Sequence, residues 1–289
     1  MENSDEALRE ARRILRGQLK KGLRNLNGQH AANPADVHDA RKHIKKARAT
    51  LRLLHGTLAR GDYRKEDDVL RDAARPLSAA RDATVLVDAL DGLSHRYRGA
   101  RHIRGARRFR RTLLDAQART QRRTLKAAGG VRHSRKLMRR ARAAAKRWSL
   151  GDNGWAALMQ GAVRLYRQGR AALDGVRVEP SVECLHHWRK QTKYLYLQLE
   201  LLAPVCSPRV SRLAQELREL SDDLGDDHDL AVLRKAAAAH AQDFPDDAGA
   251  TAFMTIIERS RTRLQRKALL RGARLYRAPP SRFARLLRH

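Results

Sequence analysis

Two segments of the chain carry the same series of basic side chains. In each, an apolar residue precedes the pattern His-x-x-Arg-Lys-x-x-Lys, and the copies lie about 148 positions apart. The first copy contributes His38, Arg41, Lys42, Lys45 and Arg48, and the second contributes His186, Arg189, Lys190 and Lys193. Steps of three, four and seven place side chains on one face of a helix. Rows of guanidinium and ammonium groups bind phosphate oxygens, so the pattern predicts an anion-binding face.

Each copy also has an apolar face. At about 100° per residue, Arg41, Lys42 and Lys45 fall within about 60° of His38. The apolar residues fall on the other side, namely Val37, Ala40, Ile44, Ala47, Leu51 and Leu54 in the first copy and Leu185, Trp188, Thr192, Leu195, Leu199 and Leu202 in the second. A solvated surface would explain one such helix. Two copies with the same residue types in register favour a binding function.

The histidines His38 and His186 have three interpretations. The first is a metal ligand, but neither histidine has a second ligand at His-x-x-x-His spacing, and the cationic neighbours would repel a metal. As buried or capping residues they would be structural. As anion contacts they would lie near unpaired N–H groups of the first helical turns, and a phosphate chain would raise their pKa. We favour the anion contact, with binding that tightens as pH falls, and predict no metal and no cofactor.

Acidic residues are interpreted as structural. Only Asp229 of the run Asp226, Asp227, His228 and Asp229 has a counterpart in the first half, Asp82, so most of the run is predicted to be turn and cap. We expect Asp82 and Asp229 to orient motif Arg or Lys side chains. Neither a Walker-type glycine loop nor a Gly-x-Ser-x-Gly motif is present. Phosphoryl transfer usually needs carboxylates that hold a divalent metal, and the cationic face lacks them. The sequence therefore predicts a binding protein and not an enzyme.

The whole chain is strongly basic. Its 289 residues include 62 Lys and Arg against 31 Asp and Glu, a formal net charge of +31. This charge predicts a polyanionic partner from one of three classes, namely nucleic acid, polyphosphate or an acidic membrane surface. Aromatic residues make up 4% of the chain, too few for the stacking platforms of a single-strand binder. Contacts to duplex phosphates stay open, including contacts from the basic segment 101–147.

The expected compartment is the cytoplasm. No run of about 18 apolar residues is present and the first residues are acidic and polar, so we expect no membrane span and no secretory signal. Cys184 and Cys206 flank the second motif helix and would lie about 30 Å apart by helical rise, too far for a disulfide. Free thiols indicate a reducing environment.

Helices must position these residues. Ala, Leu and Arg dominate and strand formers are sparse, which predicts an all-α protein. Helices are expected at residues 5–26, 36–56, 64–90, 100–128, 133–148, 154–173, 181–203, 211–240 and 248–273. Asp36 is the expected cap of the first motif helix, Pro76 is expected to kink or break the next, and Gly129-Gly130 to end the fourth.

The second half of the chain repeats the first. Residues 81–86 match residues 228–233 at an offset of about 147. The repeat adds second-rank anion contacts in two matched pairs, Lys20 with Arg167 and Arg119 with Lys267. We therefore expect two duplicated antiparallel four-helix bundles related by pseudo-two-fold symmetry, with their motif helices facing one groove. The first bundle would span 1–148, including the short basic helix, and the second 149–289.

The motif copies resemble those of the conserved histidine α-helical domain (CHAD) family over most of the chain. The resemblance implies a pair of four-helix bundles that bind inorganic polyphosphate, and targeting to polyphosphate granules. The second copy in that family often continues Lys-x-Leu-Arg-Tyr, whereas this chain has Tyr196 at the arginine position, which corresponds to Arg48 in the first copy. A phenol still donates a hydrogen bond to a phosphate oxygen.

Two alternative functions remain. An architectural nucleic-acid binder would use the same surfaces on the phosphate backbone, so non-specific nucleic acid is the second expected partner. A phosphohydrolase, or the accessory module of one, is the other alternative, since some CHAD proteins are fused to a triphosphate-processing domain. The residues alone predict a linear, phosphate-rich anion, and the resemblance selects polyphosphate.

Overall fold

The computed structural model describes residues 2–27, 34–97, 105–126, 128–148 and 154–287. Every regular element within these ranges is a helix, which confirms the all-α prediction. None of the helices described there is long and apolar enough to cross a bilayer.

Four helices of the first half form one bundle. They are α1 (Glu2–Asn25), α2 (Pro34–Leu53), α3 (Arg60–Ala74) and α6 (Ala128–Arg147). Helix α1 packs against α2 and α6, and α3 packs against the same two helices. Leucines at helical spacing hold the bundle together, since Leu15 and Leu19 of α1 and Ile44 of α2 are completely buried. The short turn η1 (Leu54–Gly56) ends α2.

The second half contributes α7 (Gly154–Val178), α8 (Val182–Leu202), α9 (Pro208–Ala239), α10 (Asp247–Leu275) and α11 (Pro280–Leu286). Helix α8 packs between α7 and α9, α10 runs along α9, and α11 covers part of α7. The turns η4 (Ala203–Val205) and η5 (Ala241–Asp243) separate these helices. Trp188 and Leu195 of α8 are completely buried in the core.

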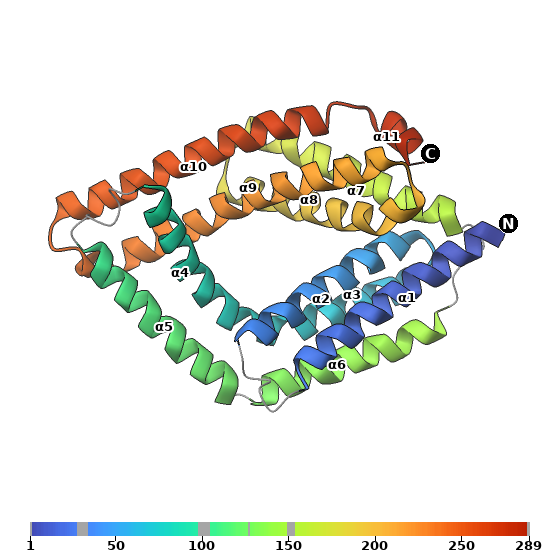
Figure 1. The fold of residues 1–289 in the computed structure, drawn as a ribbon, viewed down its shortest axis with the longest axis horizontal. Helices are drawn as coiled ribbons and strands as arrows, with labels where there is room; N and C mark the ends of the chain where they lie inside the picture. Colours follow the sequence, from blue (N-terminus) through green and yellow to red (C-terminus); the bar gives the residue numbers. More distant parts are fainter. Residues whose placement is uncertain (1, 28–33, 98–104, 127, 149–153, 288–289) are drawn as a thin grey trace.

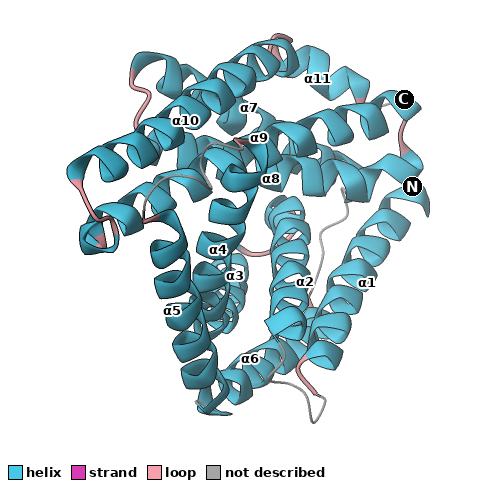
Figure 2. Ribbon diagram, turned by 60° about the vertical axis from the view of Figure 1, so that its left-hand side comes forward, coloured by secondary structure: helices cyan, strands magenta, loops and turns pink. Residues whose placement is uncertain are grey.

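A pair of helices from the first half packs on the second half. Pro76 lies in η2 (Arg75–Leu77), where the chain leaves α3 and enters α4 (Ser78–Arg96), because proline cannot continue the hydrogen bonds of a helix. Helix α4 packs against α5 (Ala106–Lys126) and against α9. A separate core joins Phe109 of α5 to Phe253 and Ile257 of α10. Figures 1 and 2 show α4 and α5 as an arm between α6 and the ends of α9 and α10.

The two halves share one large core. Residues of α1, α2, α3 and α6 belong to the same buried cluster as residues of α7, α8 and α9. Helix α2 packs on α8, and the buried Gln198 side chain donates a hydrogen bond of 3.3 Å to the carbonyl oxygen of Ala49. The division into duplicated bundles at 1–148 and 149–289 therefore stays a prediction.

Three local predictions need correction. Helix α2 begins at Pro34, so Asp36 lies in its first turn and is not the residue that precedes the helix. Gly129 and Gly130 do not end a helix but lie in the first turn of α6, which begins five residues earlier than predicted. The run 226–229 is neither turn nor cap, since it lies inside the continuous α9. The kink or break expected at Pro76 is confirmed as a break, since α3 ends at Ala74 and α4 begins at Ser78. The free state predicted for Cys184 and Cys206 is confirmed.

Candidate functional site

A groove of about 820 Å³ lies between α2, α4, α8 and α9. Figure 1 shows these four helices around the middle of the molecule. The lining of the groove includes His38, Arg41, Lys42 and Lys45 of the first motif and His186, Arg189 and Lys193 of the second. The structure therefore brings residues of both motifs, far apart in the sequence, to a single groove.

The second motif helix is positioned by its cap and by its apolar face. Ser181 precedes α8, and its hydroxyl oxygen accepts a hydrogen bond of 3.1 Å from the backbone N–H of Cys184. Leu185 and Trp188 are buried in the core, at 3% and 0% exposure. Because these residues lie on the side of the helix opposite the basic residues, their burial directs Arg189 and Lys193 outward into the groove.

Arg189 lies flat against α9 at a glycine. A Cβ atom on Gly225 would lie 3.3 Å from both Nε and Nη2 of Arg189, so a side chain at this position would crowd the guanidinium. The Nε atom of Arg189 is buried and makes no hydrogen bond within the described part of the chain. The contact with α9 thus holds the guanidinium in the groove wall.

Lys193 follows one helical turn after Arg189. Its pKa is lowered, because burial disfavours the ammonium and Arg189 repels it, although Asp222 and Asp229 partly offset both effects. No hydrogen bond or ion pair to Lys193 is found among the described residues. An anion in the groove would stabilise this half-buried charge.

Two histidine rings meet on the groove wall. The ring centroids of His186 of α8 and His228 of α9 are 4.7 Å apart, and Nδ1 of His228 lies 3.3 Å from Oδ1 of Asp229. The pKa of His186 is lowered by burial first, and then by His228 and Arg189. Asp229 thus contacts a histidine, whereas the side chain of Asp82 lies outside the described residues, so their predicted orienting role stays a prediction.

His228 is a groove residue that sequence reasoning missed. The repeat held the relevant signal, because Arg81 stands at the matching position of the first half. Lys46 of α2 and Arg218 of α9 also line the groove, and no pattern in the sequence singled them out. The lining contains seven Lys and Arg against the carboxylates of Glu200, Asp222 and Asp229, so the groove is cationic.

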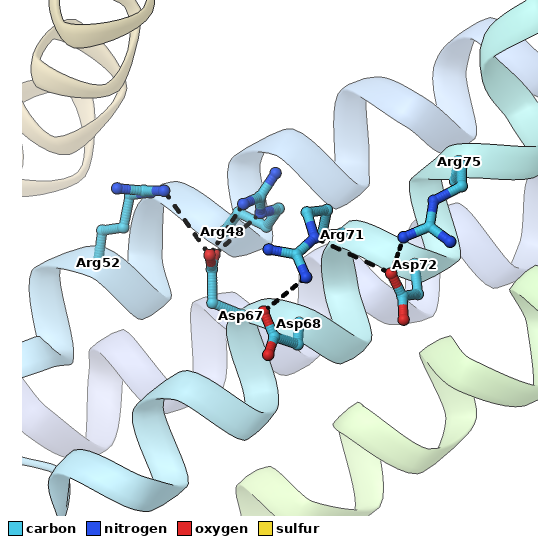
Figure 3. A network of polar contacts seen from close by, with 7 residues as sticks. All are labelled: Arg48, Arg52, Asp67, Asp68, Arg71, Asp72 and Arg75. Carbon is cyan, nitrogen blue, oxygen red and sulfur yellow. Dashed lines mark hydrogen bonds and ion pairs between the residues drawn. The ribbon is translucent and has the colours of Figure 1, made fainter.

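The side chain of Arg48 forms an ion pair with Asp67. Its Nε and Nη2 donate hydrogen bonds of 3.0 Å to the two carboxylate oxygens of Asp67 on α3, and Arg52 lies 3.7 Å from the same carboxylate (Figure 3). Burial alone would raise the pKa of Asp67, but the hydrogen bonds and charges of the two arginines lower it. Lys190 is also outside the groove lining, and its charged neighbours are Arg48, Arg52 and Asp67.

Tyr196, the counterpart of Arg48 in the second motif, does line the groove. Burial raises its pKa to about 12, and Glu200 and Asp222 act in the same direction. The phenol is therefore protonated at neutral pH and is a hydrogen-bond donor.

The second-rank candidates lie elsewhere. Lys20 of α1, Arg167 of α7 and Arg119 of α5 are exposed and do not line the groove. Nζ of Lys267 donates a hydrogen bond of 2.7 Å to Asp223 of α9. None of these four residues lines the groove, so any anion contact that they make would lie outside it, and that role stays a prediction.

The fold and the groove define an all-helical protein with two cationic motif helices around one groove. The CHAD domain matches residues 13–238, so the chain belongs to the CHAD family. PptA from Streptomyces chartreusis is similar in structure, with a TM-score of 0.68 and 18% identity, over 94% of this chain and 99% of that one. The CHAD domain from the plant Ricinus communis is also similar, with a TM-score of 0.63 and 19% identity, over 94% and 92% of the two chains. The search of curated proteins gave no match.

Proposed function

We propose that the groove binds inorganic polyphosphate without cleaving it. The observation that carries the proposal is the presence of both motif copies in the lining of one groove. Lys and Arg that neutralise the phosphates of a linear anion release its counterions, and this release favours binding. Membership of the CHAD family selects polyphosphate among the linear anions. A protein with this property would gather on polyphosphate granules in the cell.

The chemistry of the lining favours binding over catalysis. Phosphoryl transfer usually relies on carboxylates that hold Mg²⁺ against the phosphates. Here seven Lys and Arg outnumber three carboxylates in the lining, and two of these carboxylates, Asp222 and Asp229, attract Lys193. These cations would neutralise the polymer without an ion.

Competition for a labelled long-chain polyphosphate at fixed salt tests the proposal. Unlabelled long chains should displace the label at low concentration and short chains at higher concentration. Duplex DNA should displace it only weakly, since a duplex is much wider than a single phosphate chain. Displacement by DNA at equal phosphate concentration would favour a nucleic-acid groove instead. Release of phosphate that depends on Mg²⁺ would identify a phosphohydrolase and overturn the non-catalytic assignment.

The affinity should depend on pH through His186. Burial and neighbouring cations lower the pKa of His186 in the free protein, and a bound polyanion would raise it. Binding therefore takes up a proton, so affinity should rise as pH falls through the bound-state pKa and level off below the free-state pKa. One proton gives at most about tenfold per pH unit. Isothermal titration calorimetry in buffers of different ionisation enthalpy measures this uptake.

His186→Gln should reduce the proton uptake. His43→Gln is the matched control, because the pKa of His43 is also lowered by burial but its ring contacts Gln18 on α1 and does not line the groove. Equal proton uptake by wild type and His186→Gln would exclude His186 as the coupled group.

Arg48→Gln should lower stability and leave polyphosphate affinity within about twofold. The change leaves the largely buried Asp67 carboxylate without its bidentate partner, which costs about 2–3 kcal/mol of unfolding free energy. Because the pKa of Asp67 is depressed in the folded state, this contribution is present at neutral pH and is lost as pH falls below about 4. Urea unfolding at pH 7 and at acidic pH measures the difference. A loss of affinity as large as that of Arg41→Gln would place Arg48 among the polymer contacts.

A further inference from the structure

Helix α6 carries a second concentration of positive charge. It contains Arg132, Arg135, Lys136, Arg139, Arg140, Arg142, Lys146 and Arg147, and no aspartate or glutamate. All are exposed except Arg135 and Arg142, which are half-buried. Only one side of the helix is covered, where Met138, Ala141 and Ala145 enter the core. At about 100° per residue the cations fall within an arc of about 160°, on the side of α6 opposite the buried residues.

The charges of α6 are not balanced by the protein. No ion pair to any Lys or Arg of α6 is found within the described ranges. Helix α10 has a similar number of cations, but Arg261, Lys267 and Arg274 each contact a carboxylate of α9. Glu66 of α3 attracts Arg140, but burial raises the pKa of this carboxyl. Mutual repulsion along α6 costs stability unless an external anion binds there.

This surface is separate from the groove. Helix α6 packs on α1 and α3, whereas the groove lies between α2, α4, α8 and α9. Figures 1 and 2 show α6 along the lower edge of the molecule, with α1 and α3 between it and α8. A ligand on α6 therefore does not occupy the groove.

The shape and composition of α6 restrict its ligand. The surface is a convex rod of 20 residues, about 30 Å long. It has no Phe, Trp or Tyr side chain to stack on unpaired bases. The exposed large apolar residues among those described are Val178, Val182, Val232 and Leu270, so α6 offers none for insertion into a lipid surface. A duplex presents about one charge per 1.7 Å of axis, so a straight helix of this length can lie along a rigid row of phosphates.

We propose that α6 binds the phosphate backbone of duplex nucleic acid, without sequence preference, on a site independent of the groove. The interaction is electrostatic, because Lys and Arg on a helix contact phosphates without reading base edges. The protein would then hold a linear phosphate polymer in its groove and a duplex on α6 at the same time. This inference does not depend on the identity of the groove ligand.

The test uses the full chain with Arg132→Glu, Lys136→Glu and Arg139→Glu, three exposed positions on one face of α6. Binding of a fluorescent 20-base-pair DNA of random sequence is measured by anisotropy at several salt concentrations. The variant should lose at least about tenfold in affinity, and the slope of log affinity against log salt should fall by about 3, since each phosphate contact contributes about 0.9. Its affinity for long-chain polyphosphate should stay within about threefold of wild type, which also shows that it is folded.

Two controls make the result specific. Arg259→Glu with Arg263→Glu and Arg266→Glu makes the same change in net charge on exposed positions of α10. This control, and the groove variant Arg41→Glu with Arg189→Glu, should bind DNA within about threefold of wild type. If the α6 and α10 variants lose DNA affinity equally, the loss is explained by net charge and not by the α6 surface, and the proposal is overturned. Loss of DNA binding in the groove variant alone, or α6-dependent binding to anionic vesicles but not to DNA, would overturn it as well.

Discussion

Arg41→Glu combined with Arg189→Glu should weaken binding of long-chain polyphosphate by at least about 100-fold. Each residue lies in the groove lining, one from each motif. A hydrogen bond to a charged group contributes about 1.5–3 kcal/mol, so the loss of two such contacts exceeds about 3 kcal/mol, and about 1.4 kcal/mol corresponds to a factor of ten. The new carboxylates also repel the polymer. Titration at several salt concentrations measures both the affinity and the reduced salt dependence.

The matched control is Lys20→Glu with Arg167→Glu. These residues occupy equivalent positions in the two halves, are exposed, and do not line the groove. The same change in net charge should alter the affinity by no more than about threefold, since surface charges act through a screened field. If both variants lose affinity equally, the groove has no special role and the proposed function is wrong.

Gly272→Ala should destabilise the protein through Trp188. A Cβ atom at position 272 would overlap Cζ2 of Trp188 and lie 2.6 Å from Cη2, and the indole is completely buried. Overpacking of this kind costs about 1–3 kcal/mol. Trp188→Ala alone should cost about 3–5 kcal/mol, because it leaves a large cavity beneath the second motif. Urea unfolding followed by circular dichroism measures both changes.

The double variant Gly272→Ala with Trp188→Ala shows whether the contact with the Trp188 ring causes the loss of stability. Once Trp188→Ala has removed the ring, Gly272→Ala should be neutral or stabilising by up to about 1 kcal/mol, because alanine favours a helix more than glycine does. The two substitutions should therefore be strongly non-additive. Additive losses would mean that Gly272 is required for another reason, such as the path of α10.

Much of the site could be read from the sequence, because helical periodicity is a local property. The burial of Ile44 and of Trp188 follows from their place on the apolar face of each motif. Once those faces are buried, Arg41 and Arg189 must point outward. The all-α fold has the same origin, since helix formers and apolar spacing act within a few turns.

Only the tertiary structure placed these outward residues relative to one another. A helical wheel places Arg41 and Arg48 on the same face of the motif helix. In the structure Arg41 lines the groove, whereas Arg48 pairs with Asp67, because α3 packs beside the end of α2. His228 became a groove residue because α9 continues through the run 226–229 and brings its ring to His186. The sequence of a helix determines which side faces the core, but the partner of each exposed charge depends on contacts between helices far apart in the chain. Those contacts are set by the packing of the whole core, which no local pattern specifies.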